Sequence, residues 1–244
     1  MTQKTALVTG GVGGIGSAIC VELAKKGCKV FAGYHPAEEK TAEARLAEWK
    51  QQGLSIDIVS GDVGVFASCV EMAKKTGAVD ILVNCAGITR DKTLKKMTED
   101  DWNAVINVDL NSLFNVTKQY VDAMTEKGFG RIVSISSVNG KKGQFGQTNY
   151  SAAKAGVHGF TMALAQEVIR KGVTVNSVSP GYVETAMTKA IPADVAQQIV
   201  AQIPAGRMGS PEDIAYTVSF LTDERASYIT GANISVNGGL FISF

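Results

Sequence analysis

Short apolar, β-branched segments alternate along this chain with longer stretches in which apolar residues recur at helical spacing. Segments such as ILVN at 81–84 and RIVSIS at 131–136 read as apolar runs, which are typical of strands buried on both faces of a parallel sheet. The pattern predicts strands at 5–9, 29–33, 55–60, 80–84, 130–136, 173–179 and 233–236. It predicts helices at 14–26, 37–52, 65–76, 101–127, 149–171 and 211–221.

The order of these elements indicates the fold class. Strands that alternate with helices predict right-handed crossovers and an α/β fold, a Rossmann-type doubly wound parallel sheet of about seven strands with helices on both faces. The length of 244 residues allows one or two domains, but no linker, repeat, charge run or low-complexity segment divides the chain. We therefore expect a single domain over residues 1–244, with a helix-containing flap at about 184–210 that closes over a ligand.

Charge and cysteine content argue against several classes of function. Lys and Arg total 24 and Asp and Glu total 23, and this balance argues against nucleic acid or an anionic membrane as the main partner. Cys20, Cys28, Cys69 and Cys85 form no C-x-x-C pair and have no His-rich neighbours, so we expect buried free thiols and no metal site. The sequence has no apolar window long enough for a membrane span and no signal-peptide pattern, which favours the cytoplasm.

Glycine is frequent and unevenly placed. Of 26 glycines, five lie in the segment TGGVGGIG at 9–16, between the first strand and the first helix. Two spacings overlap there, G-x-G-x-x-G and T-G-x-x-x-G-x-G. Glycines let the backbone turn tightly and approach a pyrophosphate, and a helix N-terminus offers N–H groups to phosphates. A dinucleotide-binding loop is therefore predicted, with a simple glycine-rich turn as the alternative. The expected cofactor contacts are Gly10, Gly13, Gly14, Ile15 and Gly16.

A second group of residues carries candidate chemistry. Tyr150 and Lys154 are four residues apart, so in a helix that begins at Asn149 both side chains lie on one face. Ser137 follows the strand RIVSIS, at the carboxyl edge where open α/β sheets bind ligands. A free tyrosine is a poor acid or base at neutral pH, but a neighbouring ammonium favours its phenolate. We expect Tyr150 to transfer a proton, Lys154 to supply the charge, and Ser137 to hydrogen-bond the reacting oxygen.

With these motifs the chain resembles the short-chain dehydrogenases/reductases over nearly its whole length. The resemblance also rests on segments at 62–63, 84–87 and 180–185. It implies an NAD(P)H-dependent oxidoreductase in which Tyr150 and Lys154 also contact the cofactor. The further contacts that it implies are Asp62 and Val63 beside the adenine, Asn84, Ala86 and Gly87 on the strand beside the cofactor, and Pro180, Gly181, Val183 and Thr185 at the carboxamide. Cys85 replaces the family's second Asn, and an ordinary turn carboxylate is the alternative for Asp62.

One position departs from the family pattern. The family has a catalytic Asn in an N-L-x-x-x-F context, and alignment through the Leu and Phe places Asp109 at that position. Asn107 and Asn111 would lie about 200° away around an α-helix, so neither replaces it without a register shift. The family role depends partly on a main-chain carbonyl that holds a water in a proton relay to the lysine. Asp109 is the candidate catalytic residue here, since it could keep that role, and its charge could also pair with Lys154.

The segment after the second strand bears on the choice between NADH and NADPH. A 2′-phosphate requires a cation, whereas NAD sites usually place a carboxylate on the ribose. The glycine loop holds no basic residue, and Glu38 and Glu39 closely follow Tyr34. We therefore expect NADH to be favoured over NADPH, with Tyr34 and Glu38 among the cofactor contacts. Lys40 or Arg45 could still reach a 2′-phosphate, and the two Glu residues also suit a solvated helix N-terminus.

A closer resemblance concerns the substrate. Segments at 87–91, 136–140, 142–150 and 179–182 look like those of the acetoacetyl-CoA reductases of polyhydroxyalkanoate synthesis, whose sister group is the 3-oxoacyl-acyl-carrier-protein reductases. The resemblance implies an acyl-CoA partner and reduction of acetoacetyl-CoA to (R)-3-hydroxybutyryl-CoA. The implied substrate contacts are Asp91, Ser137, Gln144, Phe145, Gln147, Tyr150 and Tyr182, although loop packing is an alternative for the residues that flank the catalytic ones.

Other readings stay open. A carrier-protein substrate would require a basic patch near the mouth of the site, which Lys92, Lys95, Lys96, Lys141 and Lys142 could form, but the same lysines could meet CoA phosphates. A non-catalytic dinucleotide sensor tends to lose the Tyr or the Lys, and a nucleotide-sugar epimerase would need a larger C-terminal domain. The family is typically tetrameric, so we expect a homotetramer. The apolar tail at 239–244 suits a subunit contact or packing within its own subunit.

Overall fold

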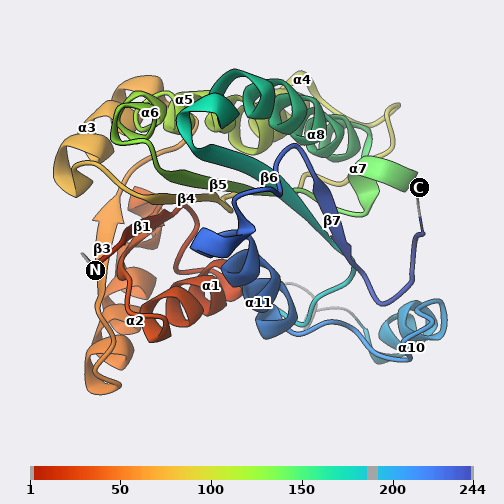
Figure 1. Ribbon diagram of the computed structural model, residues 1–244. Helices are drawn as coiled ribbons and strands as arrows, with labels where there is room; N and C mark the ends of the chain where they lie inside the picture. The colour runs from red at the N-terminus through yellow and green to blue at the C-terminus, as the bar shows by residue number, and fades with distance from the viewer. Residues whose placement is uncertain (1–2, 186–191, 243–244) are drawn as a thin grey trace.

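Seven parallel strands form one sheet in the order β3-β2-β1-β4-β5-β6-β7. The computed structural model describes residues 3–185 and 192–242 (Figure 1). The strands are β1 (Thr5–Val8), β2 (Lys29–Tyr34), β3 (Ile56–Ser60), β4 (Ile81–Asn84), β5 (Gly130–Ile135), β6 (Val173–Pro180) and β7 (Asn233–Val236). Each predicted strand is present, shifted by at most one residue at either end, and the doubly wound Rossmann-type fold is confirmed. The strand order reverses between β1 and β4, the kind of switch point at which such sheets bind ligands.

Helices cover both faces of the sheet, as Figure 1 shows. On one face lie α1 (Gly14–Lys25), α2 (Glu39–Gln51) and α11 (Pro211–Leu221), and on the other lie α3 (Phe66–Thr76) and α8 (Thr148–Val168). Successive residues of β1 enter different cores: Ala6 joins a cluster with Ile19 of α1 and Ile214 of α11, whereas Leu7 joins a cluster with Met72 of α3. Because both faces are buried, the strands need apolar residues at nearly every position.

The helical layer differs from the prediction in several places. The prediction of one helix at 101–127 is wrong: α4 (Glu99–Ile106) leads into a π-helical turn, η2 (Asn107–Asn111), then α5 (Ser112–Thr117) and, after a break, α6 (Val121–Lys127). α4 starts early because Thr98 and Asp101 form a capping box. Short 3₁₀ turns, η1 (Pro36–Glu38) and η3 (Ile169–Lys171), occupy the ends of two other predicted helices, and α7 (Asn139–Lys142) is an addition that the sequence pattern does not predict.

The two ends of the predicted flap are hydrogen-bonded to each other. Glu184 N donates to Gly209 O at 2.8 Å, Gly209 N donates to Tyr182 O at 2.9 Å, and α10 (Ala193–Ala201) lies between these positions in the sequence. Residues 186–191 lie outside the described residues, so closure of the flap stays a prediction, as does the single-domain organisation.

The apolar tail is described as far as residue 242. Asn237 Nδ2 donates to Phe241 O at 2.8 Å, and Ile242 is exposed. Residues 243–244 lie outside the described residues, and the subunit contact expected of this tail stays a prediction. No helix within 3–185 and 192–242 is both long and apolar enough to cross a lipid bilayer.

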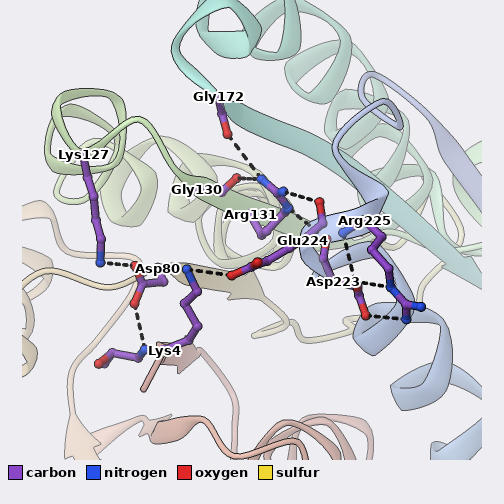
Figure 2. A network of polar contacts seen from close by, with 10 residues as sticks. Lys4, Asp80, Lys127, Gly130, Arg131, Gly172, Asp223, Glu224 and Arg225 are labelled. Atoms are coloured by element: carbon purple, nitrogen blue, oxygen red, sulfur yellow. Dashed lines mark hydrogen bonds and ion pairs between the residues drawn. The ribbon is translucent and has the colours of Figure 1, made fainter. Parts of the chain in front are cut away.

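A network of charged residues lies at the edge of the sheet where the strands begin (Figure 2). Arg131, at the start of β5, is buried. Its guanidinium donates to the main-chain oxygens of Gly130, Gly172, Asp223 and Glu224 at 2.9–3.3 Å. Asp80, before β4, accepts from Thr5 N at 2.9 Å and pairs with Lys127 at 2.5 Å. These charged groups hold strand starts together, at the edge opposite the glycine loop.

Candidate active site

The glycine loop lies at the switch point between β1 and β4. Gly10 has a φ of +62°, and a Cβ on Gly16 would overlap the Gly10 carbonyl, so both positions require glycine. A Cβ on Gly14 would lie 2.9 Å from Thr185 Cγ2, whereas the nearest atom to one on Gly13 is 3.4 Å away. No described side chain caps α1, which begins at Gly14. The N–H groups of its first turn, Ile15 included, therefore suit the phosphates of a dinucleotide.

Thr9 connects this loop by hydrogen bonds to the segment that follows β4. Its Oγ1 accepts hydrogen bonds from Cys85 N at 3.0 Å and Ala86 N at 3.2 Å. Asn84 is buried, and its Nδ2 donates to hydroxyls of α5 and β5 at 3.3 and 3.4 Å. Asn84 and Ala86 were predicted as cofactor contacts. Thr9 was given no site role, although its position before the first glycine was a usable signal.

The ends of β2 and β3 bring together residues predicted to meet the adenine and ribose. Asp62 Oδ1 accepts from Gly64 N at 2.9 Å, and its Oδ2 lies 3.6 Å from His35 Nε2. Glu38 Oε2 accepts from His35 N at 3.3 Å, which completes a capping box on η1. Tyr34 is buried in the core beneath β2, so its side chain packs inward while Asp62, Glu38 and His35 line the edge. His35 was not among the predicted site residues.

Lys154 is the centre of the candidate catalytic group. It is buried in α8, and its ammonium donates to Ile135 O at 3.1 Å. The Asp109 carboxylate lies 3.2 Å from Nζ, and its other oxygen accepts from Ile88 N at 2.9 Å. The ring of Tyr150 lies 5.5 Å from Nζ, measured to the ring centroid. The structure therefore brings three of the four predicted catalytic side chains into one cluster.

Opposing effects act on the charge of Lys154. Burial lowers its pKa, but Asp109 raises it, followed by Tyr150 and Cys85, and the net pKa is raised. Burial raises the pKa of Cys85 to about 12, against the influence of Lys154, so this thiol is neutral at physiological pH. A Cβ on Gly87 would come within 3.0 Å of Asp109 Oδ2 and 3.3 Å of Lys154 Nζ. Glycine at that position leaves room for the ion pair.

The π-helical turn sets the direction of the side chains around Asp109. Asn107 Nδ2 donates to Gly64 O at 3.1 Å, and Asn111 Nδ2 donates to Asn107 Oδ1 at 3.3 Å. In the following α5, Asn115 Nδ2 donates to Val63 O at 3.0 Å. These amides hold the 62–64 turn, while Asp109 alone of the acidic or amide residues of this turn contacts Lys154 in the described structure.

The fourth catalytic candidate, Ser137, belongs to a polar chain on the substrate side. Its Oγ accepts from Asn139 N at 3.1 Å. Asn139 Nδ2 donates to Gln147 Oε1 at 2.9 Å, and Gln147 Nε2 donates to Asp91 Oδ2 at 2.7 Å. Three predicted substrate residues are thus connected through Asn139, which was not among the predicted site residues.

Other predicted contacts lie around this chain. Phe145 is 86% exposed, and Gln144 Oε1 accepts from Lys142 Nζ at 2.7 Å. Lys92 pairs with Asp101 at 2.7 Å. Tyr182 and Val183 lie at the base of the flap, where Val183 forms a parallel β-bridge with Gly209. Just before them, Pro180 O accepts a hydrogen bond from Val138 N at 2.8 Å. A Cβ added to Gly181 would contact Asn237.

This arrangement matches a known family. The family model described as short chain dehydrogenase matches residues 4–196. The chain belongs to the short-chain dehydrogenase family. Its predicted family, its Rossmann-type fold and its class as an oxidoreductase are confirmed. Members of this family use NAD(P)H.

Several relatives of this short-chain dehydrogenase match over nearly their full length. It is 58% identical to an acetoacetyl-CoA reductase of Allochromatium vinosum, over 98% of this chain and 99% of that protein. It is 55% identical to an acetoacetyl-CoA reductase of Cupriavidus necator, with the same coverage. It is 45% identical to a 3-oxoacyl-acyl-carrier-protein reductase of Pseudomonas aeruginosa, over 98% of each chain.

Proposed function

We propose that this short-chain dehydrogenase is an acetoacetyl-CoA reductase that forms (R)-3-hydroxybutyryl-CoA for polyhydroxyalkanoate synthesis. The observation that carries the proposal is the clustering of Tyr150, Lys154 and Asp109 beside the chain of contacts from Ser137 to Asp91. Relatives named acetoacetyl-CoA reductase, at 58% and 55% identity, support this substrate. The second candidate is a 3-oxoacyl-acyl-carrier-protein reductase, which the 45% identical relative favours less strongly.

The chain's residues fit a nicotinamide dinucleotide. The uncapped first turn of α1 suits the pyrophosphate. Asp62 with Val63 would hold the adenine, the segment Asn84, Ala86 and Gly87 would lie along the cofactor, and Lys154 with Tyr150 would meet the nicotinamide ribose. Thr185 lies close to Gly14, which supports the loop from Pro180 to Thr185 as the contact for the carboxamide.

The residues of the chain handle the proton of the reaction. When bound, NAD(P)H supplies the hydride that the 3-keto carbon accepts. Tyr150 gives its phenolic proton to the ketone oxygen as negative charge develops there. Ser137 Oγ accepts from Asn139 N, so its own hydrogen can be donated to the same oxygen. Lys154 stays charged because Asp109 raises its pKa against the effect of burial. The charged lysine then holds Tyr150 and the nicotinamide ribose in position.

NADH is the cofactor that the local charges favour. Glu38 is fixed at the end of β2 by its hydrogen bond from His35 N, and its charge disfavours a 2′-phosphate. Arg45, one of two cations that could reach a phosphate, pairs with Glu48 at 2.9 Å.

We also propose a cytoplasmic homotetramer. Phe66 and Phe114 stack with ring centroids 5.9 Å apart, although both are exposed, as is Met162 of α8. Apolar side chains on that helical face suit a contact with a second subunit. The four free cysteines suit a reducing compartment.

The proposed function is tested by following the near-ultraviolet absorbance of the reduced cofactor. Acetoacetyl-CoA and an acetoacetyl-carrier-protein are each offered with NADH and with NADPH. We expect acetoacetyl-CoA with NADH to give the highest kcat/KM. A higher kcat/KM for the carrier-protein substrate would establish the second candidate, and no oxidation of either cofactor would contradict both.

A further inference from the structure

Positive charge gathers on one rim of the candidate active site. Two segments form this rim: residues 90–97, between β4 and α4, and residues 141–147, which join the end of α7 to α8. Lys92 N donates to Gly146 O at 2.9 Å, so the two segments lie side by side. Each also carries a member of the polar chain that begins at Ser137. The rim therefore borders the substrate side of the site.

Several cations of this rim have no acidic partner among the described residues. Lys92 pairs with Asp101 at 2.7 Å, and Asp91, the one acid within 90–97, accepts a hydrogen bond from Gln147 Nε2. The exposed cations for which the described part of the chain offers no ion pair are Arg90, Lys95, Lys96 and Lys142. Lysine and arginine are charged at neutral pH, so these four side chains offer unneutralised positive charge to a ligand.

Lys95 and Lys96 lie on a turn of this rim, close to exposed apolar side chains. Lys96 N donates to Thr93 O at 2.8 Å and closes the turn. Leu94 of the same turn is 66% exposed, and Phe145 of the neighbouring segment is 86% exposed. Ammonium groups bind phosphates, and an exposed aromatic ring stacks on a nucleotide base. Cations and an aromatic ring on one rim therefore suit a ligand that carries both phosphates and a base.

We propose that Lys95 and Lys96 bind the phosphates of coenzyme A, with Phe145 beside its adenine and the acyl thioester at Tyr150. This inference rests on the proposed function, in which acetoacetyl-CoA is the substrate. In coenzyme A a pantetheine arm separates the thioester from a pyrophosphate and a 3′-phosphate, so the phosphates lie away from the reacting carbon. Contacts with them are the same in the bound substrate and in the transition state, so the two lysines lower KM without changing kcat.

Charge on the neighbouring surface favours coenzyme A over an acidic carrier protein as the ligand of this rim. Glu99 and Asp100, in the first turn of α4, are exposed and follow Lys96 closely in the sequence. A protein partner covers about 800 Å², so an acidic protein seated on the lysines would also face these carboxylates. Like charges that face each other in an interface are unfavourable. The phosphates of a small ligand can contact the cations alone.

Lys95→Gln combined with Lys96→Gln tests the proposal, because it removes two charges from exposed side chains. Coenzyme A is titrated calorimetrically into the native protein and the variant, with NAD⁺ and NADP⁺ in excess so that its nucleotide cannot enter the cofactor site. The dissociation constant of coenzyme A should rise at least about fivefold in the variant at low ionic strength. Added salt should shrink the difference between the two proteins, because it screens the charges.

The matched control is Lys25→Gln combined with Lys26→Gln. These two lysines are also adjacent and exposed, but they lie at the end of α1, just before β2 begins and far from the rim. The control loses the same charge as the test variant, so it should bind coenzyme A as tightly as the native protein does.

Reduction rates give a second measurement. In the variant that lacks Lys95 and Lys96, KM for acetoacetyl-CoA should rise by the same factor as the dissociation constant, while kcat stays native. With acetoacetyl-pantetheine, which has no phosphates, kcat/KM should be the same in both proteins. An equal loss with both substrates would overturn the proposal, as would an unchanged dissociation constant for coenzyme A. A larger loss with an acetoacetyl-carrier-protein than with acetoacetyl-CoA would assign the rim to that protein and would also overturn it.

The phosphate site and the proposed function can fail separately. If binding of coenzyme A depends on the two lysines but acetoacetyl-CoA is not reduced, the proposed function fails and the phosphate site stands. If the variant reduces acetoacetyl-CoA with a native KM, the phosphate site fails and the proposed function stands.

Discussion

Ser136, which follows β5, forms a hydrogen bond with His158 of α8. His158 lies one helical turn after Lys154 in the same helix. Ser136 Oγ donates to Lys154 O at 2.8 Å and lies 2.8 Å from His158 Nε2. One hydroxyl hydrogen cannot serve both contacts, so Nε2 carries the imidazole proton and donates to Ser136. Ser179 Oγ lies 3.4 Å from the same nitrogen. A neutral His158 thereby fixes the part of α8 that carries Lys154.

We predict that protonation of His158 weakens the fold. Burial, and then the charge of Lys141, lower the pKa of His158. The unfolded chain therefore binds the proton first as the pH falls. The stability provided by the neutral ring is complete above about pH 6.5 and is lost as the pH falls from there through the folded-state pKa. His158→Gln keeps an N–H donor but does not titrate, so its free energy of unfolding should change less over this range than that of the native protein.

Urea unfolding at several pH values measures this difference. His35→Gln is the matched control, because His35 is the other histidine of the chain and lies at the exposed start of η1. The slope for His158→Gln is then compared with that of His35→Gln as well as with that of the native protein. If the free energy of unfolding of His158→Gln falls with pH as steeply as that of the native protein, the loss of stability in acid is due to other groups.

Tyr150→Phe separates chemistry from binding. The substitution removes the proton donor while the ring keeps its place 5.5 Å from the ammonium of Lys154. Reduction of acetoacetyl-CoA should fall at least about a hundredfold, with the dissociation constant of the cofactor, measured by titration calorimetry, nearly unchanged. Tyr216→Phe, at an exposed position of α11, should leave both quantities at native values. Turnover at the native rate in Tyr150→Phe would remove Tyr150 from the mechanism.

Much of the fold was predictable because both faces of the sheet are covered. Ala6, Leu7 and Val8 are all buried although they alternate between two cores, so their apolar run marks a strand without ambiguity. The break at 107–111 was not predictable, because π-helical turns are rare and no Pro or Gly within 101–127 marks an interruption of the helix. Its tertiary reason is visible in Asn107, whose amide reaches Gly64 O, a contact between residues 43 positions apart.

The candidate site was predictable where short motifs fix neighbours along the chain. The spacing of Tyr150 and Lys154 and the glycine loop are of this kind. Asn139, His35 and Thr9 were missed, because each acts through partners that only the folded chain brings near, such as Gln147 for Asn139. Tyr34 was predicted as a cofactor contact. The structure buries its side chain in the same core cluster as Val30 and Ala32 of β2, and its contact with the cofactor stays a prediction.

Gly13→Arg should shift the cofactor preference toward NADPH. Among the loop glycines, Gly13 has no atom closer than 3.4 Å to an added Cβ, and its backbone, at φ −76° and ψ 174°, suits any residue. An arginine there supplies a cation that a 2′-phosphate requires, so kcat/KM for NADPH relative to NADH should rise at least about tenfold. Gly13→Gln, similar in reach but uncharged, is the control and should leave the preference unchanged. An equal change in both variants would contradict an electrostatic cause.

Gly87→Ala should lower activity with little loss of stability. The added Cβ would lie 3.0 Å from Asp109 Oδ2 and 3.3 Å from Lys154 Nζ, so the ion pair must move by a few tenths of an ångström. A displacement of that size at the proton-transfer site should reduce kcat about tenfold, while Tm changes little because Gly87 is exposed. Gly159→Ala is the opposite control: its Cβ meets nothing within 4 Å on α8. It should keep native kcat and stabilise the fold by about 0.5–1 kcal/mol. Native kcat in Gly87→Ala would show that the position of the ion pair does not limit catalysis.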